Sequence, residues 1–117
     1  IPNGRDIILL ATHFDHSSSQ NRLSQTNWVR QYAATLSGPV ILAGDLNARR
    51  GSQPLNLLAS SFQATARTGF TFPAGVPDRR IDWILPKIGG QTALGDRVVP
   101  EAVASDHRPL WLDIAIE

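Results

Sequence analysis

Two short apolar runs, separated by a stretch of helical periodicity, place the strongest limits on the fold of this chain. The first run covers residues 6–12 (Asp-Ile-Ile-Leu-Leu-Ala-Thr), and the second covers residues 40–44 (Val-Ile-Leu-Ala-Gly). Apolar runs of this length, bounded by polar residues, predict buried strands. Residues 21–36 between them have apolar side chains near helical spacing, and Ser-Gly-Pro at 37–39 is a helix-ending sequence. The pattern therefore predicts a strand–helix–strand unit.

The remainder of the chain adds one more predicted helix and three further strands. The helix is expected at 55–60, and the strands at 80–86, 91–99 and 110–116, with 70–72 as a possible short strand. The resulting order, β-α-β-α-β-β-β, predicts an α/β (α+β) domain with one mixed β-sheet and helices on one face. At 117 residues the chain forms one domain at most.

Composition excludes several classes of function. The chain has no cysteine, which rules out disulfides, zinc–thiolate sites and thiol catalysis. Its formal charge of +1 neither requires nor excludes a nucleic-acid partner. No apolar run approaches the roughly 20 residues of a membrane helix, so no membrane span is predicted. The chain begins at Ile1 and contains no methionine, so we expect it to be part of a longer protein.

The second apolar run ends in Gly44-Asp45-Leu46-Asn47, which places a carboxylate and a carboxamide two residues apart. On extended backbone, residues i and i+2 point to the same side, so Asp45 and Asn47 can share a water molecule or a phosphoryl group. The same residue types also follow strands in ordinary turns, where they bond to the local backbone. Both interpretations stay open for this motif alone.

A second polar motif, Asp106-His107, stands at the entrance of the last predicted strand. Its imidazole can take a proton from water near neutral pH. The alternative is an Asp106 that caps a turn beside a partly buried, hydrogen-bonded His107. Asp82 lies among large apolar residues and needs a partner if it is buried. A histidine is one candidate, and a salt bridge to Arg79 or Arg80 is the other.

The first strand ends in a segment with two histidines, His13 and His16. A metal cluster is one interpretation, although imidazole-rich ligation is typical of transition metals. We favour a functional His13 and a structural His16. The arginine pairs at 49–50 and 79–80 suit phosphate recognition, but solvated loop charges are the favoured interpretation.

Taken together, these segments resemble the endonuclease/exonuclease/phosphatase superfamily from about residue 6 to residue 116. Four motifs occur in the family's order: Thr12-His13, Gly44-Asp45-Leu46-Asn47, Arg80-Ile81-Asp82-Trp83-Ile84 and Ser105-Asp106-His107-Arg108-Pro109. The sequence Phe-Thr-Phe-Pro at 70–73 is similar to the bacterial branch.

The resemblance implies a hydrolase that cleaves phosphoester bonds with water as the nucleophile and Mg²⁺ or Mn²⁺ as cofactor. It implies that His107 is the general base or the electrostatic partner of the phosphate, and that Asp82 orients His107. Asn47 and His13 would hold the phosphate oxygens.

The resemblance also implies that Asp45 aligns the attacking water or contacts the metal, and that Asp106 contributes to metal binding. Hard oxygen ligands of this kind suit Mg²⁺. The substrate class stays open, because the family acts on DNA, RNA, inositol phosphates, sphingomyelin and nucleotide-linked esters.

Domains of this DNase I-like family are four-layered α/β-β/α sandwiches built from two similar halves. The order of the motifs matches the second half, so residues 1–117 are expected to be the C-terminal half of such a domain. The first half normally supplies an early Asn and a metal-binding Glu. The remaining acidic residues of this chain fit no family motif: Asp6, Asp78, Asp96, Glu101, Asp113 and Glu117. Trp83 also stands where the family more often has Tyr or His.

A half-domain leaves one sheet face uncovered, because its helices cover only one side. The near-continuous apolar runs predict strands covered on both sides. We expect the uncovered face, with Ile8, Leu10, Ile41, Ala43 and Trp111 or their alternates, to form a homodimer. The alternative to an enzyme is a half-domain that folds, alone or as such a dimer, but does not catalyse. A third interpretation is a protein that binds phosphate but catalyses no reaction, and it depends on the same residues.

Overall fold

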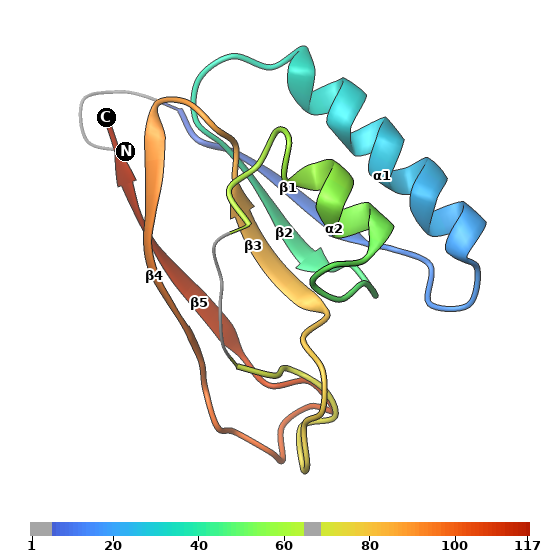
Figure 1. The fold of residues 1–117 in the computed structure, drawn as a ribbon. Coiled ribbons are helices and arrows are strands. Elements are labelled where there is room, and N and C mark those ends of the chain that lie inside the picture. Colours follow the sequence, from blue (N-terminus) through green and yellow to red (C-terminus); the bar gives the residue numbers. More distant parts are fainter. Residues whose placement is uncertain (1–5, 65–68) are drawn as a thin grey trace.

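The computed structural model describes residues 6–64 and 69–117. Its elements follow the predicted order: β1 (Ile8–His13), α1 (Ser19–Ala34), β2 (Val40–Asp45), α2 (Gln53–Leu58), β3 (Asp82–Pro86), β4 (Gln91–Val98) and β5 (Leu110–Ile116). The possible strand at 70–72 is only an isolated bridge between Phe72 and Arg79. The α+β class with helices on one face of a mixed sheet is confirmed (Figure 1).

The strands form two hydrogen-bonded sheets, so the prediction of one sheet is wrong. β1 and β2 pair in parallel, and β3 adds antiparallel to β2. β4 and β5 form a separate antiparallel pair with a register irregularity between Ala93 and Gly95. β5 contacts β3 but forms no ladder with it. Gly89 and Gly90, which both have positive φ, form part of the connection from β3 to β4.

Both helices pack on the same face of the β1–β2–β3 sheet, as Figure 1 shows. α1 begins after Ser18, whose hydroxyl accepts a hydrogen bond from the Asn21 amide at 3.1 Å and so caps the helix. Pro54 stands in the first turn of α2, where its missing N–H costs nothing. The core between helices and sheet is built from buried apolar residues: Phe14, Val29, Ala33, Leu42, Leu46, Ala48, Leu55, Leu58, Phe62, Trp83 and Leu85.

Within residues 6–64 and 69–117, no helix lies on the opposite face of this sheet. In β1, Leu10 packs against the core, so the alternating residues Leu9 and Ala11 face away from the helices. Leu9 pairs in register with Ile41 and is 62% exposed. The prediction that Ile41 lies on the uncovered face agrees with this register. In β1, the residues on the uncovered face are Leu9 and Ala11, which alternate with the predicted Ile8 and Leu10.

The ends of the three strands bring polar residues into one row. His13 closes β1, Asp45 closes β2, and the register pairs His13 with Asp45 and Asp45 with Asp82. Because residues in register lie side by side across a sheet, these three side chains share one edge. In the part of the chain that the structure describes, no helix is long and apolar enough to span a membrane.

Candidate active site

Gly44 allows β1 and β2 to approach closely just before the first site residue. Its φ is +148°, and a Cβ at this position would lie 1.8 Å from the carbonyl oxygen of Thr12. Only glycine fits such a close backbone approach. The Gly-Asp sequence therefore fixes Asp45 beside the end of β1, and the Phe14 amide donates to the Asp45 carbonyl at 2.9 Å.

Asp45 and Asn47 form a tight turn at the end of β2. The Asn47 amide donates to Oδ1 of Asp45 at 2.9 Å, and Asn47 itself has φ +46°. Its side-chain Nδ2 donates to the carbonyl of Phe14 at 2.8 Å, which fixes the carboxamide. Both interpretations of the motif therefore apply. The residues bond to the local backbone, and the second Nδ2 hydrogen of Asn47 stays available to a ligand.

Asp82 and His107 form the hydrogen-bonded pair at the centre of the site. Nδ1 of His107 lies 2.7 Å from Oδ2 of Asp82. The other candidate was a salt bridge to Arg79 or Arg80, and no ion pair of Asp82 with an arginine is found among the described residues. Arg80 pairs with Asp96 at 2.8 Å instead. A carboxylate on Nδ1 fixes the imidazole tautomer and turns Nε2 outward.

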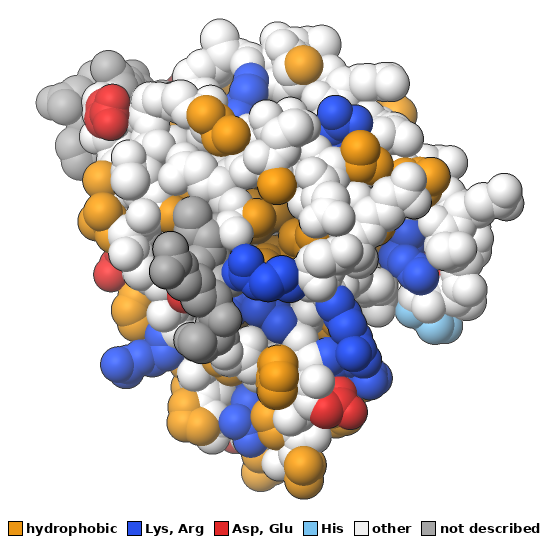
Figure 2. Space-filling view, viewed as in Figure 1, with side chains coloured by type: hydrophobic (Ala, Val, Ile, Leu, Met, Phe, Trp, Pro, Cys, Tyr) orange, Lys and Arg blue, Asp and Glu red, His pale blue; other side chains and the backbone are white. Residues whose placement is uncertain are grey.

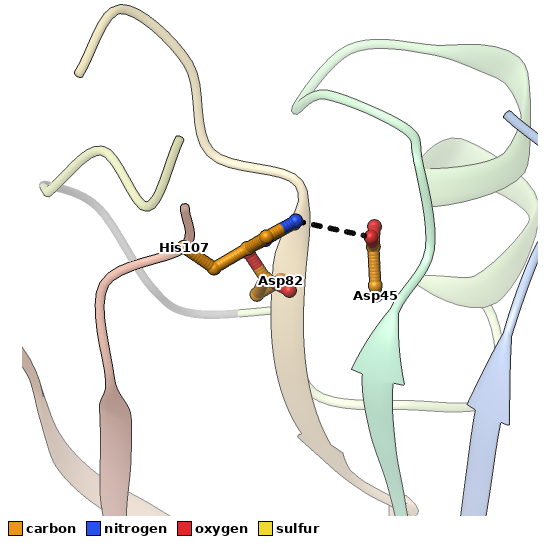
Figure 3. Close-up of side chains that lie close together, drawn as sticks. All are labelled: Asp45, Asp82 and His107. Atoms are coloured by element: carbon orange, nitrogen blue, oxygen red, sulfur yellow. Dashed lines mark hydrogen bonds and ion pairs between the residues drawn. The ribbon is translucent and has the colours of Figure 1, made fainter. Parts of the chain in front are cut away.

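The outward nitrogen of His107 points toward Asp45 (Figure 3). Nε2 lies 3.6 Å from Oδ2 of Asp45 and 4.0 Å from Oδ1 of Asp106. Partial burial lowers the pKa of His107. The hydrogen bond and charge of Asp82, with the charges of Asp45 and Asp106, outweigh this effect and raise the pKa above its ordinary value. The site therefore favours the imidazolium form.

Two residues that the sequence did not single out as functional hold this pair in place. The ring of Phe72 lies against His107, with centroids 4.8 Å apart and planes tilted by 50°. Thr71 accepts the Asp82 amide on Oγ1 at 3.4 Å, and its carbonyl accepts the Arg108 amide at 2.7 Å. The only sequence signal for them was the Phe-Thr-Phe-Pro segment.

The predicted site residues line one open pocket of about 580 Å³. Five of the six line it directly: His13, Asp45, Asn47, Asp106 and His107. The sixth, Asp82, reaches it through His107. The side chain of His13 is 72% exposed, with Nε2 3.4 Å from Asp45. His16, expected to be structural, also lines the pocket, as an exposed residue.

One arginine of each predicted pair lines this pocket, and the other lies on the Trp83 ring. Arg49 and Arg79 contribute to the pocket wall. The guanidinium carbons of Arg50 and Arg80 lie 5.9 Å and 4.9 Å from the Trp83 ring centroid. The favoured interpretation treated both arginine pairs as solvated loop charges. It describes Arg49 and Arg79 only in part, because both also line the pocket.

The carboxylates could hold a divalent cation. One ligand atom each from Asp45, Asp82 and His107 lies within 4.8 Å of the others. The predicted metal residue Asp106 is not in this group, and its side chain is 79% exposed. Because Nδ1 of His107 is occupied by Asp82, the Asp45 carboxylate is the best placed donor for a hard cation.

The comparisons with known proteins agree with this geometry. The sequence model of the endonuclease/exonuclease/phosphatase family matches residues 10–107. The chain belongs to this family. The matched range includes the first three motifs in full and the fourth as far as His107. No curated protein sequence matches the chain.

Solved structures with the same fold are about twice as long as this chain. An endonuclease/exonuclease/phosphatase family protein from Bacteroides thetaiotaomicron superposes with a TM-score of 0.82 at 18% identity, over 99% of this chain and 53% of its own. A mannosyl-6-phosphatase from the same organism gives 0.80 at 20% identity, over 97% and 53%. Beta toxin from Staphylococcus aureus, with bound magnesium ions, gives 0.72 at 17% identity, over 92% and 53%. The chain thus spans about half the length of these structures.

Proposed function

We propose that residues 1–117 form the C-terminal half of a metal-dependent phosphoester hydrolase. The observation that supports this best is the Asp82–His107 pair facing Asp45, beside a pocket that Arg49 and Arg79 also line. An aspartate–imidazole pair opposite a second carboxylate is suited to water attack on phosphorus.

In the proposed reaction the side chains of the site act on the phosphate and on the attacking water. His107, held by Asp82 and favoured as imidazolium, donates from Nε2 to a phosphoryl oxygen and stabilises its growing charge. Asp45 aligns the attacking water and takes its proton as the water oxygen bonds to phosphorus, while the bond from phosphorus to the leaving ester oxygen breaks. Nδ2 of Asn47 and the ring of His13 bind the remaining phosphate oxygens. This assigns His107 the electrostatic role rather than that of the base.

We propose Mg²⁺ or Mn²⁺ as the cofactor, held by Asp45 with help from Asp106. Carboxylate oxygens are the ligands that these cations prefer. A bound cation would neutralise charge on the phosphoryl oxygens. The magnesium ions of the S. aureus beta toxin structure support this choice.

Hydrolysis of bis-p-nitrophenyl phosphate tests the proposal. We expect Mg²⁺- or Mn²⁺-dependent release of p-nitrophenol, and a loss of roughly 10²–10⁴-fold in His107→Ala and in Asp45→Asn. Asp113→Asn, an exposed acidic residue of β5, is the control with the same charge change as Asp45→Asn. Variants that stay folded and keep the wild-type rate would refute these roles.

A non-catalytic half-domain is the alternative, and one feature favours it. Neither glutamate of the chain, Glu101 or Glu117, lines the pocket. Glu101 instead accepts the amides of Val103 and Ala104 at 3.1 and 2.9 Å and closes a turn. A chain that binds phosphate at His107 but never releases p-nitrophenol with either cation would support this alternative.

We also propose that a second copy of the chain covers the uncovered sheet face. On this face Leu9 is 62% exposed. Trp111, predicted for the same face, is 43% exposed but lies in β5 of the second sheet. Apolar patches above a few hundred Å² rarely stay bare in monomers, by a rough threshold. Sedimentation equilibrium at micromolar concentration should give twice the chain mass of 12.7 kDa. A well-folded species of 12.7 kDa would refute the homodimer.

A further inference from the structure

A second pocket, of about 370 Å³, adjoins the proposed catalytic pocket. It lies between the first turn of α1 and the first turn of α2, and it shares Asn47 and Arg49 with the catalytic pocket. A ligand bound to both shared residues can therefore extend from one pocket into the other. Its polar lining is Ser19, Arg22, Asn47, Arg49, Ser52 and Gln53.

All charged side chains that line this second pocket are positive. It is lined by two arginines and by no acidic residue. The Arg49 guanidinium forms no hydrogen bond, ion pair or ring contact with any residue that the structure describes, and it is exposed. Nη1 of Arg22 donates to the Asp15 carbonyl at 2.9 Å, which anchors this guanidinium and leaves its other N–H groups available. The two cations thus have donors to spare for a ligand.

The adjoining catalytic pocket adds the positive charge of Arg79 to that of Arg22 and Arg49. Figure 2 shows several Lys and Arg side chains on one face of the molecule, with few Asp or Glu side chains among them. The whole chain has a net charge of only +1, so this gathering is local. Local positive charge around a cleft concentrates anionic ligands.

We propose that the second pocket binds a second phosphate group of the substrate. This inference rests on the proposed function, because the first phosphate occupies the pocket of His107. Guanidinium groups bind phosphate in a bidentate manner, and two of them without a carboxylate suit an anion better than a neutral sugar or a cationic head group. The second phosphate could belong to the next nucleotide of a strand or to a small bisphosphate.

Binding of a matched pair of probes tests this inference without turnover. Propane-1,3-diol bisphosphate and its monophosphate are titrated in the presence of a chelator, with NMR shifts of the arginine Nε–H and His107 signals as the readout. We expect the bisphosphate to bind about tenfold more tightly, which is the effect of one charge-assisted hydrogen bond. A short oligothymidylate distinguishes the two sources, since only a strand site would prefer it to the small bisphosphate.

Four variants at three arginines make the result specific. Arg49→Gln should reduce the preference for bisphosphate to about one, and Arg49→Lys should restore part of it. Arg79→Gln removes the same charge from the catalytic pocket alone, so it should weaken both probes equally and keep the ratio. Arg50→Gln, next in sequence but outside both pockets, should change neither affinity.

The outcomes separate the two proposals. Equal affinity of the wild-type chain for both probes, with shifts at His107, overturns the second pocket and leaves the catalytic proposal intact. A preference that survives Arg49→Gln also overturns it. If neither probe binds, this inference fails, and the hydrolysis assay decides the proposed function separately.

Discussion

Replacing Asp82 by asparagine tests the pair on which the proposed site depends. The substitution keeps the shape of the side chain and removes the charge 2.7 Å from Nδ1 of His107. A hydrogen bond between charged groups contributes about 1.5–3 kcal/mol to stability. The two side chains are 19% and 27% exposed, so solvent screening reduces this value. We expect Asp82→Asn to lower the free energy of unfolding by about 1–2 kcal/mol at acidic pH.

The sign of the pH dependence follows from the raised pKa of His107. The folded chain holds the imidazole proton at a higher pH than the unfolded chain does. This contribution is therefore fully present below the ordinary histidine pKa of about 6.5 and is lost as the pH rises through the raised pKa of the folded state. The stability difference between the wild-type chain and Asp82→Asn should therefore be largest near pH 5.5, about one unit below the ordinary histidine pKa of about 6.5. It should be smallest near pH 9, roughly 2.5 units above that pKa.

Urea unfolding followed by tryptophan fluorescence at both pH values measures this difference. An NMR titration of His107 in both proteins should show a lower pKa in Asp82→Asn. The control is Asp106→Asn, whose carboxylate is 4.0 Å from Nε2 and 79% exposed, and which should change stability little. A stability difference that is equal at both pH values, together with an unchanged pKa of His107, would refute the argument.

Three further substitutions test the frame around the site. Gly44→Ala should lower the free energy of unfolding in urea by roughly 3 kcal/mol or more, because the added Cβ would lie 1.8 Å from the Thr12 carbonyl oxygen. A loss below about 1 kcal/mol would contradict this. Trp83→Phe removes the indole N–H that donates to the buried Ala48 carbonyl at 2.9 Å, and should cost about 1–3 kcal/mol. Leu9→Glu should turn the proposed dimer into a monomer in sedimentation equilibrium while leaving the helix content by circular dichroism unchanged.

Much of the fold follows from local patterns in the sequence. The apolar runs 6–12 and 40–44 became β1 and β2, and the periodic segment 21–36 became α1 within two residues at each end. These signals are local, because side-chain period and caps depend on near neighbours. The division into two sheets was not predictable in this way. It depends on strand pairing between distant parts of the chain, since β4 pairs with β5 and neither strand forms a ladder with β3.

For the candidate site, too, the sequence predicted local features but not the contacts between distant residues. Motifs at strand ends indicated which residues to bring together, because register places such ends at one edge. The sequence left two partners open for Asp82, and the choice of His107 over an arginine required the distance of 2.7 Å. Phe72 lies against His107 from a loop without regular structure, so no period in the sequence could predict that contact.

The register also connects the proposed site with the uncovered face of the sheet. Alternation places Asp45 on the same side of β2 as Ile41 and Ala43, and the same holds for His13 relative to Leu9 and Ala11. A second chain or half-domain that packs on the apolar side chains of this face would therefore lie next to the catalytic pocket. A covering half-domain could place its own carboxylate next to Asp45, where the present chain supplies no glutamate. Association and metal binding should consequently depend on each other, so that metal affinity rises with protein concentration if the covering half is a second copy.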